Sequence, residues 1–129
     1  MLKPFIAFTL LLLSLALASC EKENEPTYYV RYEAHRELPN AVGLQIRYTT
    51  AEGKSQTVKN PDADYLFVMV GPVRSGFIAD LYASGYGGDN PKGVSTRISV
   101  CMGSEPFVLK ASHGGKDFLN SKCQYRVGR

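Results

Sequence analysis

From residue 27 onward, hydrophobic and polar residues alternate with a period of two, which is the spacing of a β-strand with one buried face. Tyr28, Val30, Tyr32 and Ala34 form the hydrophobic side of the first such stretch. Similar stretches recur along the chain, and we expect strands at 28–35, 42–49, 55–58, 65–70, 77–84, 94–102, 107–111 and 122–127. No segment between them has the long helical periodicity that a βαβ unit requires. The pattern therefore predicts an all-β fold, an antiparallel two-sheet sandwich of about 7–8 strands, with a small closed barrel as the alternative.

Three segments add detail to this prediction. Gly53 lies in the short connection 51–54, where a hairpin with a bulge requires a positive φ. The run 65–70 is continuously apolar, so we expect a strand that is covered on both faces. The longest loop is 85–93, and Tyr86 within it is a candidate binding anchor for a sugar or a protein.

The first twenty-five residues have the order of a secretory signal. A short start with Lys3 precedes the largely apolar run 5–17. About 13 residues reach roughly 20 Å as a helix, which is too short to span a hydrocarbon core of about 30 Å. A signal peptide is therefore favoured over a transmembrane anchor.

The segment Leu17-Ala18-Ser19-Cys20 resembles the lipobox of bacterial lipoproteins. The resemblance implies cleavage before Cys20, which would carry acyl chains such as palmitate and hold the protein on the membrane. We expect a signal peptide at 1–19, a lipidated acidic tether at 20–26 and a β-sandwich domain at 27–129. The expected location is the outer membrane of the cell envelope, lipid-anchored and either surface-exposed or facing the periplasm.

The remaining cysteines form an even pair. With Cys20 assigned to lipid, Cys101 and Cys123 are left in an oxidising compartment, where a disulfide bond is the default. The bridge would close a loop of about 22 residues and stabilise the fold by roughly 3 kcal/mol. A zinc site and a nucleophilic pair of Cys101 with His113 are the alternatives, and both lack supporting motifs.

The mature region also resembles the MmpS-type envelope domains. The shared features are the Tyr-x-Val-x-Tyr opening at 28–32, the hairpin at 48–53, the strand 97–100 and the two late cysteines. The resemblance implies an immunoglobulin-like sandwich and a role as an accessory subunit of an envelope export complex. The chain departs from that pattern because it contains no Trp and has a lipobox in place of a transmembrane helix.

Length and charge exclude several functional classes. The 129 residues leave room for one ordinary domain. Removing residues 1–19 takes away one basic residue, Lys3, and leaves 14 basic against 12 acidic residues, spread along the chain. This distribution does not favour nucleic acid as a partner.

Candidate chemistry is sparse. The loop 85–93 lacks the Gly-Lys-Ser/Thr of a phosphate-binding loop, and we expect no cofactor and no catalytic residue. The aspartates, among them Asp80, are mostly expected in turns rather than in an acid–base pair. Asp62 and Asp64 could contribute to a Ca²⁺ site, but further ligands are missing, so no metal is predicted.

Tyrosine is the most unusual feature of the composition, with eight Tyr and no Trp. Tyr29 and Tyr82 fall on the polar sides of their strands, and Arg31 and Arg47 occupy similar positions. Tyr and Arg on one exposed sheet face would form a protein-binding patch. The candidate binding residues are Tyr29, Arg31, Tyr82 and Tyr86.

The sequence therefore predicts a lipid-anchored, non-enzymatic binding module of the cell envelope, with another envelope protein or an extracellular ligand as its partner. The alternatives are an accessory subunit of an envelope export complex and a small envelope inhibitor or ligand-capture protein.

Overall fold

The computed structural model describes residues 25–87 and 90–128. The predicted signal peptide, Cys20 and most of the tether lie outside these residues. The described strands are β1 (Tyr28–Arg36), β2 (Leu44–Thr49), β3 (Ser55–Asn60), β4 (Tyr65–Val73), β5 (Ile78–Gly85), β6 (Val94–Met102), β7 (Val108–Gly114) and β8 (Asn120–Arg126). A membrane-crossing helix is absent from the described part of the chain.

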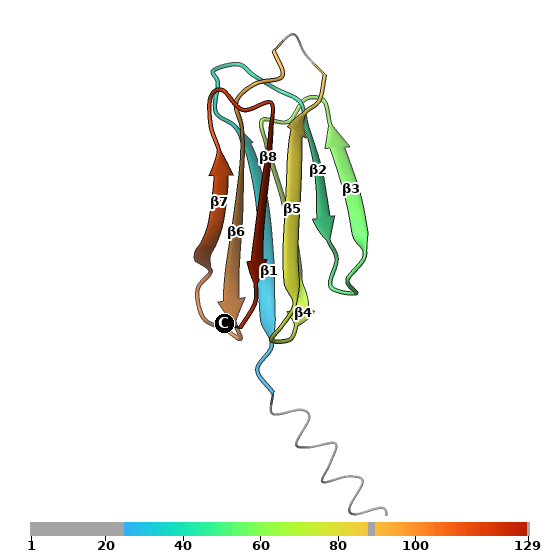
Figure 1. The fold of residues 1–129 in the computed structure, drawn as a ribbon, viewed down its shortest axis with the longest axis vertical. Helices are drawn as coiled ribbons and strands as arrows, with labels where there is room; N and C mark the ends of the chain where they lie inside the picture. Colours follow the sequence, from blue (N-terminus) through green and yellow to red (C-terminus); the bar gives the residue numbers. More distant parts are fainter. Residues whose placement is uncertain (1–24, 88–89, 129) are drawn as a thin grey trace, which may run out of the picture.

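The strands form two four-stranded sheets, with the orders β4-β1-β6-β7 and β3-β2-β5-β8. Every pairing is antiparallel, and the two sheets stack face to face with the strands along the long axis (Figure 1). This arrangement confirms the predicted sandwich and each of the eight expected strands. The start of β1 and the C-terminal end lie at the same end of the molecule (Figure 1).

The core is built from the inward side chains of both sheets. Its largest fully buried members are Tyr32 from β1, Leu44 and Ile46 from β2, Leu81 from β5 and Ile98 from β6. These residues are the hydrophobic positions of the period-two pattern, so burial follows directly from the alternation.

Two glycines show why the connections have their shapes. Gly53 has a φ of +82° in the β2–β3 hairpin, which confirms the expected positive value. Gly43 precedes β2 with a φ of +104°, and a Cβ there would lie 1.7 Å from the carbonyl oxygen of Tyr86. The Tyr86 N–H donates to the Gly43 carbonyl at 3.1 Å, so only glycine allows the two loops to approach this closely.

A buried arginine links the loops at the same end of the sandwich. Arg36 continues the inward side of β1 and is only 2% exposed. Its guanidinium donates to the carbonyl oxygens of Gly43 at 2.9 Å and Lys92 at 2.7 Å, and also to those of Val42 and Asn90. Burial lowers the pKa of Arg36. Backbone carbonyls rather than a carboxylate satisfy its donors, and they tie the loops before β2 and before β6 to β1.

The prediction that 65–70 is covered on both faces was wrong. Leu66, Val68 and Val70 pack against the core, but Phe67 and Met69 are 57% and 53% exposed. The reason is topological, because β4 is an edge strand and one face of its sheet is not covered by any other described element.

The predicted disulfide bond was also wrong, because Cys101 and Cys123 are both free and buried. Cys123 on β8 belongs to the core between the sheets. Cys101 on β6 faces the opposite way, beside Tyr29 in the strand register, and does not belong to that core. The two thiols therefore lie on different sheets and on different sides of β6.

Candidate interaction surface

The outer surface of the sheet β4-β1-β6-β7 gathers exposed hydrophobic side chains. Strand register places Tyr65 beside His35, Phe67 beside Glu33 and Met69 beside Arg31, all on the side of the sheet that faces away from the core. We call this surface the aromatic face and define it by Tyr29, Tyr65, Phe67, Met69 and Leu109. Each of these five side chains is between 37% and 57% exposed.

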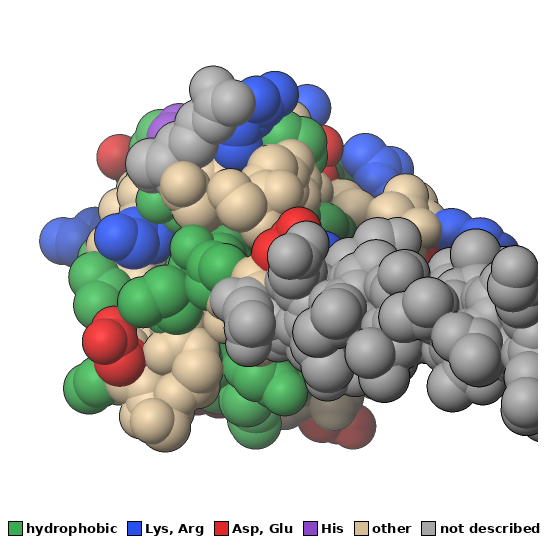
Figure 2. Space-filling model, turned by 90° about the horizontal axis from the view of Figure 1, so that it is seen from below, with side chains coloured by type: hydrophobic (Ala, Val, Ile, Leu, Met, Phe, Trp, Pro, Cys, Tyr) green, Lys and Arg blue, Asp and Glu red, His purple; other side chains and the backbone are tan. Residues whose placement is uncertain are grey.

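The end view of the molecule shows the same asymmetry. Seen from the end at which β1 begins, the visible hydrophobic side chains are more frequent in one half of the view, and most visible Lys and Arg side chains lie in the other (Figure 2). A surface on which several large hydrophobic side chains are exposed together is typical of a site for a partner.

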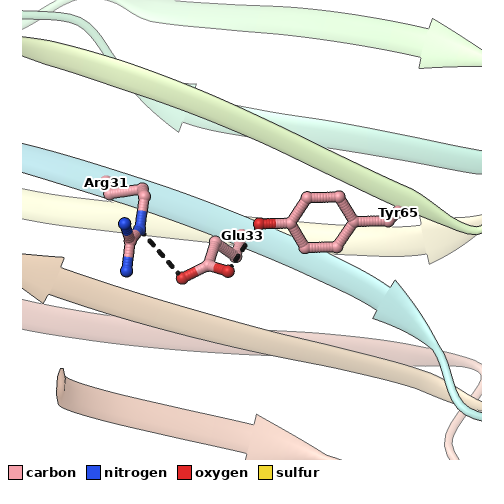
Figure 3. Close-up of polar contacts among 3 residues, drawn as sticks. All are labelled: Arg31, Glu33 and Tyr65. Atoms are coloured by element: carbon pink, nitrogen blue, oxygen red, sulfur yellow. Dashed lines mark hydrogen bonds and ion pairs between the residues drawn. The ribbon is translucent and has the colours of Figure 1, made fainter.

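A polar cluster lies in the middle of the aromatic face. Glu33 accepts a hydrogen bond from Arg31 Nε at 3.1 Å and another from the Tyr65 hydroxyl at 2.6 Å (Figure 3). Partial burial, together with the bond to Glu33, raises the pKa of Tyr65 to about 12. Both carboxylate oxygens of Glu33 are thus engaged, which holds the Tyr65 ring in a defined position on the sheet.

Arg97 leaves a positive charge on this face. It lies directly across from Glu33 in the register of β1 and β6, yet among the described residues it forms no ion pair. Together with Glu33, His35 and Tyr65 it lines a shallow hollow of about 280 Å³. The hollow combines an aromatic ring with an available guanidinium, which are the two side-chain types most enriched at interface hot spots.

The lower part of the face depends on a glycine. A Cβ on Gly71 would lie 2.6 Å from Cδ1 of Tyr29, so the Tyr29 ring lies directly over the backbone of β4. The Arg31 guanidinium lies 4.7 Å from the centre of the Phe107 ring, which precedes β7. Residues from β1, β4 and the β6–β7 turn therefore form one continuous surface.

The structure separates the candidate residues that the sequence singled out. Tyr29 and Arg31 share the aromatic face, whereas Tyr82 lies on the outer surface of the other sheet, with the Arg47 guanidinium 5.0 Å from its ring. Tyr86 follows β5, and Lys59 Nζ lies 5.6 Å from its ring. The four candidates therefore do not form one patch.

Three members of the aromatic face, Tyr65, Phe67 and Met69, were missed because the run 65–70 was expected to be buried on both sides. The available signal was weak. The three inward residues of this run are aliphatic, whereas the three outward ones are two aromatics and a methionine.

A contact between a hydroxyl group and an imidazole joins β7 and β8, but it lacks the accessibility of a nucleophile and its base. Ser121 Oγ lies 3.2 Å from His113 Nδ1, but Ser121 is 1% exposed and its hydroxyl also contacts Thr96 Oγ1 at 2.7 Å. These three residues join β6, β7 and β8 through hydrogen bonds. The alternative pair of Cys101 and His113 is not formed, because His113 lies across from Thr96, far along β6 from Cys101.

Metal ligands do not gather in the described segments 25–87 and 90–128, which contain no group of three His, Cys, Asp or Glu side chains suited to an ion.

Comparisons with known proteins show no family for this chain, since no family model and no curated protein matches it.

Proposed function

We propose that this chain is a lipid-anchored, non-enzymatic binding module of the bacterial cell envelope, which recognises another envelope protein through the aromatic face. The observation that carries the proposal is the exposure of Phe67 and Met69 on a strand whose other side packs on the core. Exposed apolar side chains of this size lower the solubility of a protein unless a partner covers them. Burying apolar surface against a partner stabilises the complex by about 25 cal/mol per Å².

The chemistry of the face supports a protein partner. Tyr, Phe and Met provide large contact areas, and Arg97 and Glu33 provide charges that fix the orientation of the partner. The hydrogen bonds to Glu33 hold the Tyr65 ring before binding occurs, so little side-chain entropy is lost in the complex.

The proposed anchor rests on the lipobox-like segment Leu17-Ala18-Ser19-Cys20. Replacement of Cys20 by Ala tests the anchor by itself. We expect wild-type protein in the detergent-soluble membrane fraction of the cells and the Cys20→Ala variant outside it. Equal distribution of the two would show that Cys20 carries no anchoring lipid.

Site-specific crosslinking tests the aromatic face. A photoreactive residue at Phe67 should capture one defined envelope protein in intact cells, whereas the same residue at Thr57, on the outer surface of the other sheet, should not. The Arg97→Ala variant should reduce the yield from position 67 several-fold. Equal yields from positions 67 and 57, or no product from position 67, would contradict the proposal.

A further inference from the structure

The outer surface of the second sheet, β3-β2-β5-β8, differs in character from the aromatic face. Its strands place four cations outward, and Asp80 is the one acidic residue at the outward positions of these strands. The cations are Arg47, Lys59, Lys122 and Arg126.

A small hollow lies on this basic face. It measures about 170 Å³, and its polar lining comes from Arg47, Thr49, Ser55, Asp80, Tyr82 and Lys122. Ligand pockets for drug-sized molecules occupy about 300–1,000 Å³, so this hollow has room for one small unit only. The surrounding sheet surface leaves space for the rest of a longer chain to which that unit belongs.

The carboxylate of Asp80 has unused hydrogen-bonding capacity. Its Oδ2 accepts one bond from Gln124 Nε2 at 3.2 Å, and its buried Oδ1 accepts none from the described residues. A carboxylate has about four acceptor positions, and the last torsion of Asp is broad, so rotation offers either oxygen to the hollow. A buried acceptor without a donor is destabilising, and a hydroxyl group of a ligand would supply the missing donor.

Charge balance selects the class of ligand. Arg47 and Lys122 flank Tyr82 in the strand register, and neither forms an ion pair within the described part of the chain. With Asp80, the hollow carries a formal charge of about +1. A ligand with one carboxylate and several neutral hydroxyl groups brings the summed formal charge of hollow and ligand to zero. An amino acid would leave the excess charge, and a phosphate ester, with a charge of about −1.5 to −2, would exceed it.

We propose that this hollow binds an acidic sugar residue of the uronic acid type. Its carboxylate would be held between Arg47 and Lys122, its hydroxyl groups would donate to Asp80 and bond with Thr49 and Ser55, and its ring would lie near Tyr82. The site is on the opposite sheet from the aromatic face. The test of this inference therefore does not depend on whether the aromatic face binds a protein partner.

The test is a titration of the full chain with methyl glucuronide, followed by NMR through the backbone amides. Methyl glucoside supplies the same ring without the acid, acetate supplies the acid without the ring, and glycerol phosphate supplies a dianion with hydroxyl groups. We expect the glucuronide to bind at least about tenfold more tightly than each of the others and to shift the amides of Asp80, Tyr82 and Lys122.

Two variants localise the site. Lys122→Ala should weaken binding of the glucuronide about tenfold, and Asp80→Asn should do the same without a change in side-chain volume. Lys59→Ala is the matched control, because it removes the same charge from the same face outside the hollow. Equal loss in Lys59→Ala and Lys122→Ala would show diffuse attraction to a basic surface and overturn the inference. Equal affinity for the glucuronide and any one of the three comparison compounds, or no binding of the glucuronide, would also overturn it.

Discussion

The hydroxyl group of Tyr32 on β1 donates a hydrogen bond to the backbone carbonyl of Thr49 at the end of β2, at 2.9 Å. The two residues belong to different sheets, so this bond crosses the whole core. Tyr32 is fully buried, and its ring lies 5.4 Å from that of Tyr48. A core tyrosine thus contributes both packing and a polar tie between the layers.

Replacement of Tyr32 by Phe should lower the free energy of unfolding by about 1–2 kcal/mol, because the Thr49 carbonyl loses its donor while the ring volume is kept. Urea unfolding measures the change. A loss under about 0.3 kcal/mol would show that water replaces the hydroxyl group at no cost.

Tyr32 should also make the free energy of unfolding depend on pH in the alkaline range. Burial, and after it the charge of Asp80, raises the pKa of Tyr32 in the folded state well above its ordinary value. The folded protein therefore keeps a proton that the unfolded chain loses above about pH 10, so stability is fully present below that pH and falls above it. Urea unfolding between pH 9 and about 11.5 should show a smaller decline in Tyr32→Phe than in the wild type. Parallel curves would assign the decline to other groups.

Arg36 should be the most sensitive charged residue in the described part of the chain. Arg36→Lys removes the planar fork that reaches carbonyl groups of two loops, and we expect a loss of at least about 2 kcal/mol. Arg126→Lys, on the exposed surface of β8, is the control and should change stability by under about 0.5 kcal/mol. Similar losses in both variants would mean that the carbonyl bonds to Arg36 do not stabilise the loops.

Two glycines with positive φ values allow the cost of backbone strain to be distinguished from the cost of a steric clash. Gly53→Ala should cost about 1 kcal/mol, because its φ is positive but nothing lies within 4 Å of the new Cβ. Gly43→Ala also has a positive φ, and its Cβ would collide with the Tyr86 carbonyl, so it should cost several times more or prevent folding. Thermal unfolding of both variants gives the comparison, and equal melting temperatures would contradict the clash.

The two described cysteines should remain unlinked even in protein recovered from an oxidising compartment. Burial raises the pKa of the Cys123 thiol, which slows its reaction further. Alkylation of the denatured protein without reductant should label both Cys101 and Cys123, whereas the folded protein should label slowly. Detection of a peptide pair joined through these two sulfurs would show a different arrangement of β6 and β8.

The period-two pattern was sufficient to predict the strands, because each strand has one side in the core. The same pattern could not assign strands to sheets or say which outer face remains open. For this reason Tyr29 and Tyr82 were grouped although they lie on opposite surfaces, and Cys101 and Cys123 were paired although they point in different directions. Such errors concern contacts between residues distant in the chain, which local alternation does not encode.

Arg36 is a different case, because the signal was present. It follows Tyr28, Val30, Tyr32 and Ala34 at the same spacing, and this position places it inside the sandwich. A charged residue at an inward position predicts a set of hydrogen-bond acceptors nearby, but the carbonyl groups that serve here come from two loops whose paths only the fold reveals.

The two outer surfaces of this sandwich point in opposite directions, and both run along the axis that leads away from the first described residues (Figure 1). A molecule seated on one sheet leaves the other fully open, so occupancy of the two can be simultaneous and noncompetitive. A domain of this shape can hold two bound molecules close to each other. Each bound molecule then has a high effective concentration around the other, because one rigid domain sets the distance between them.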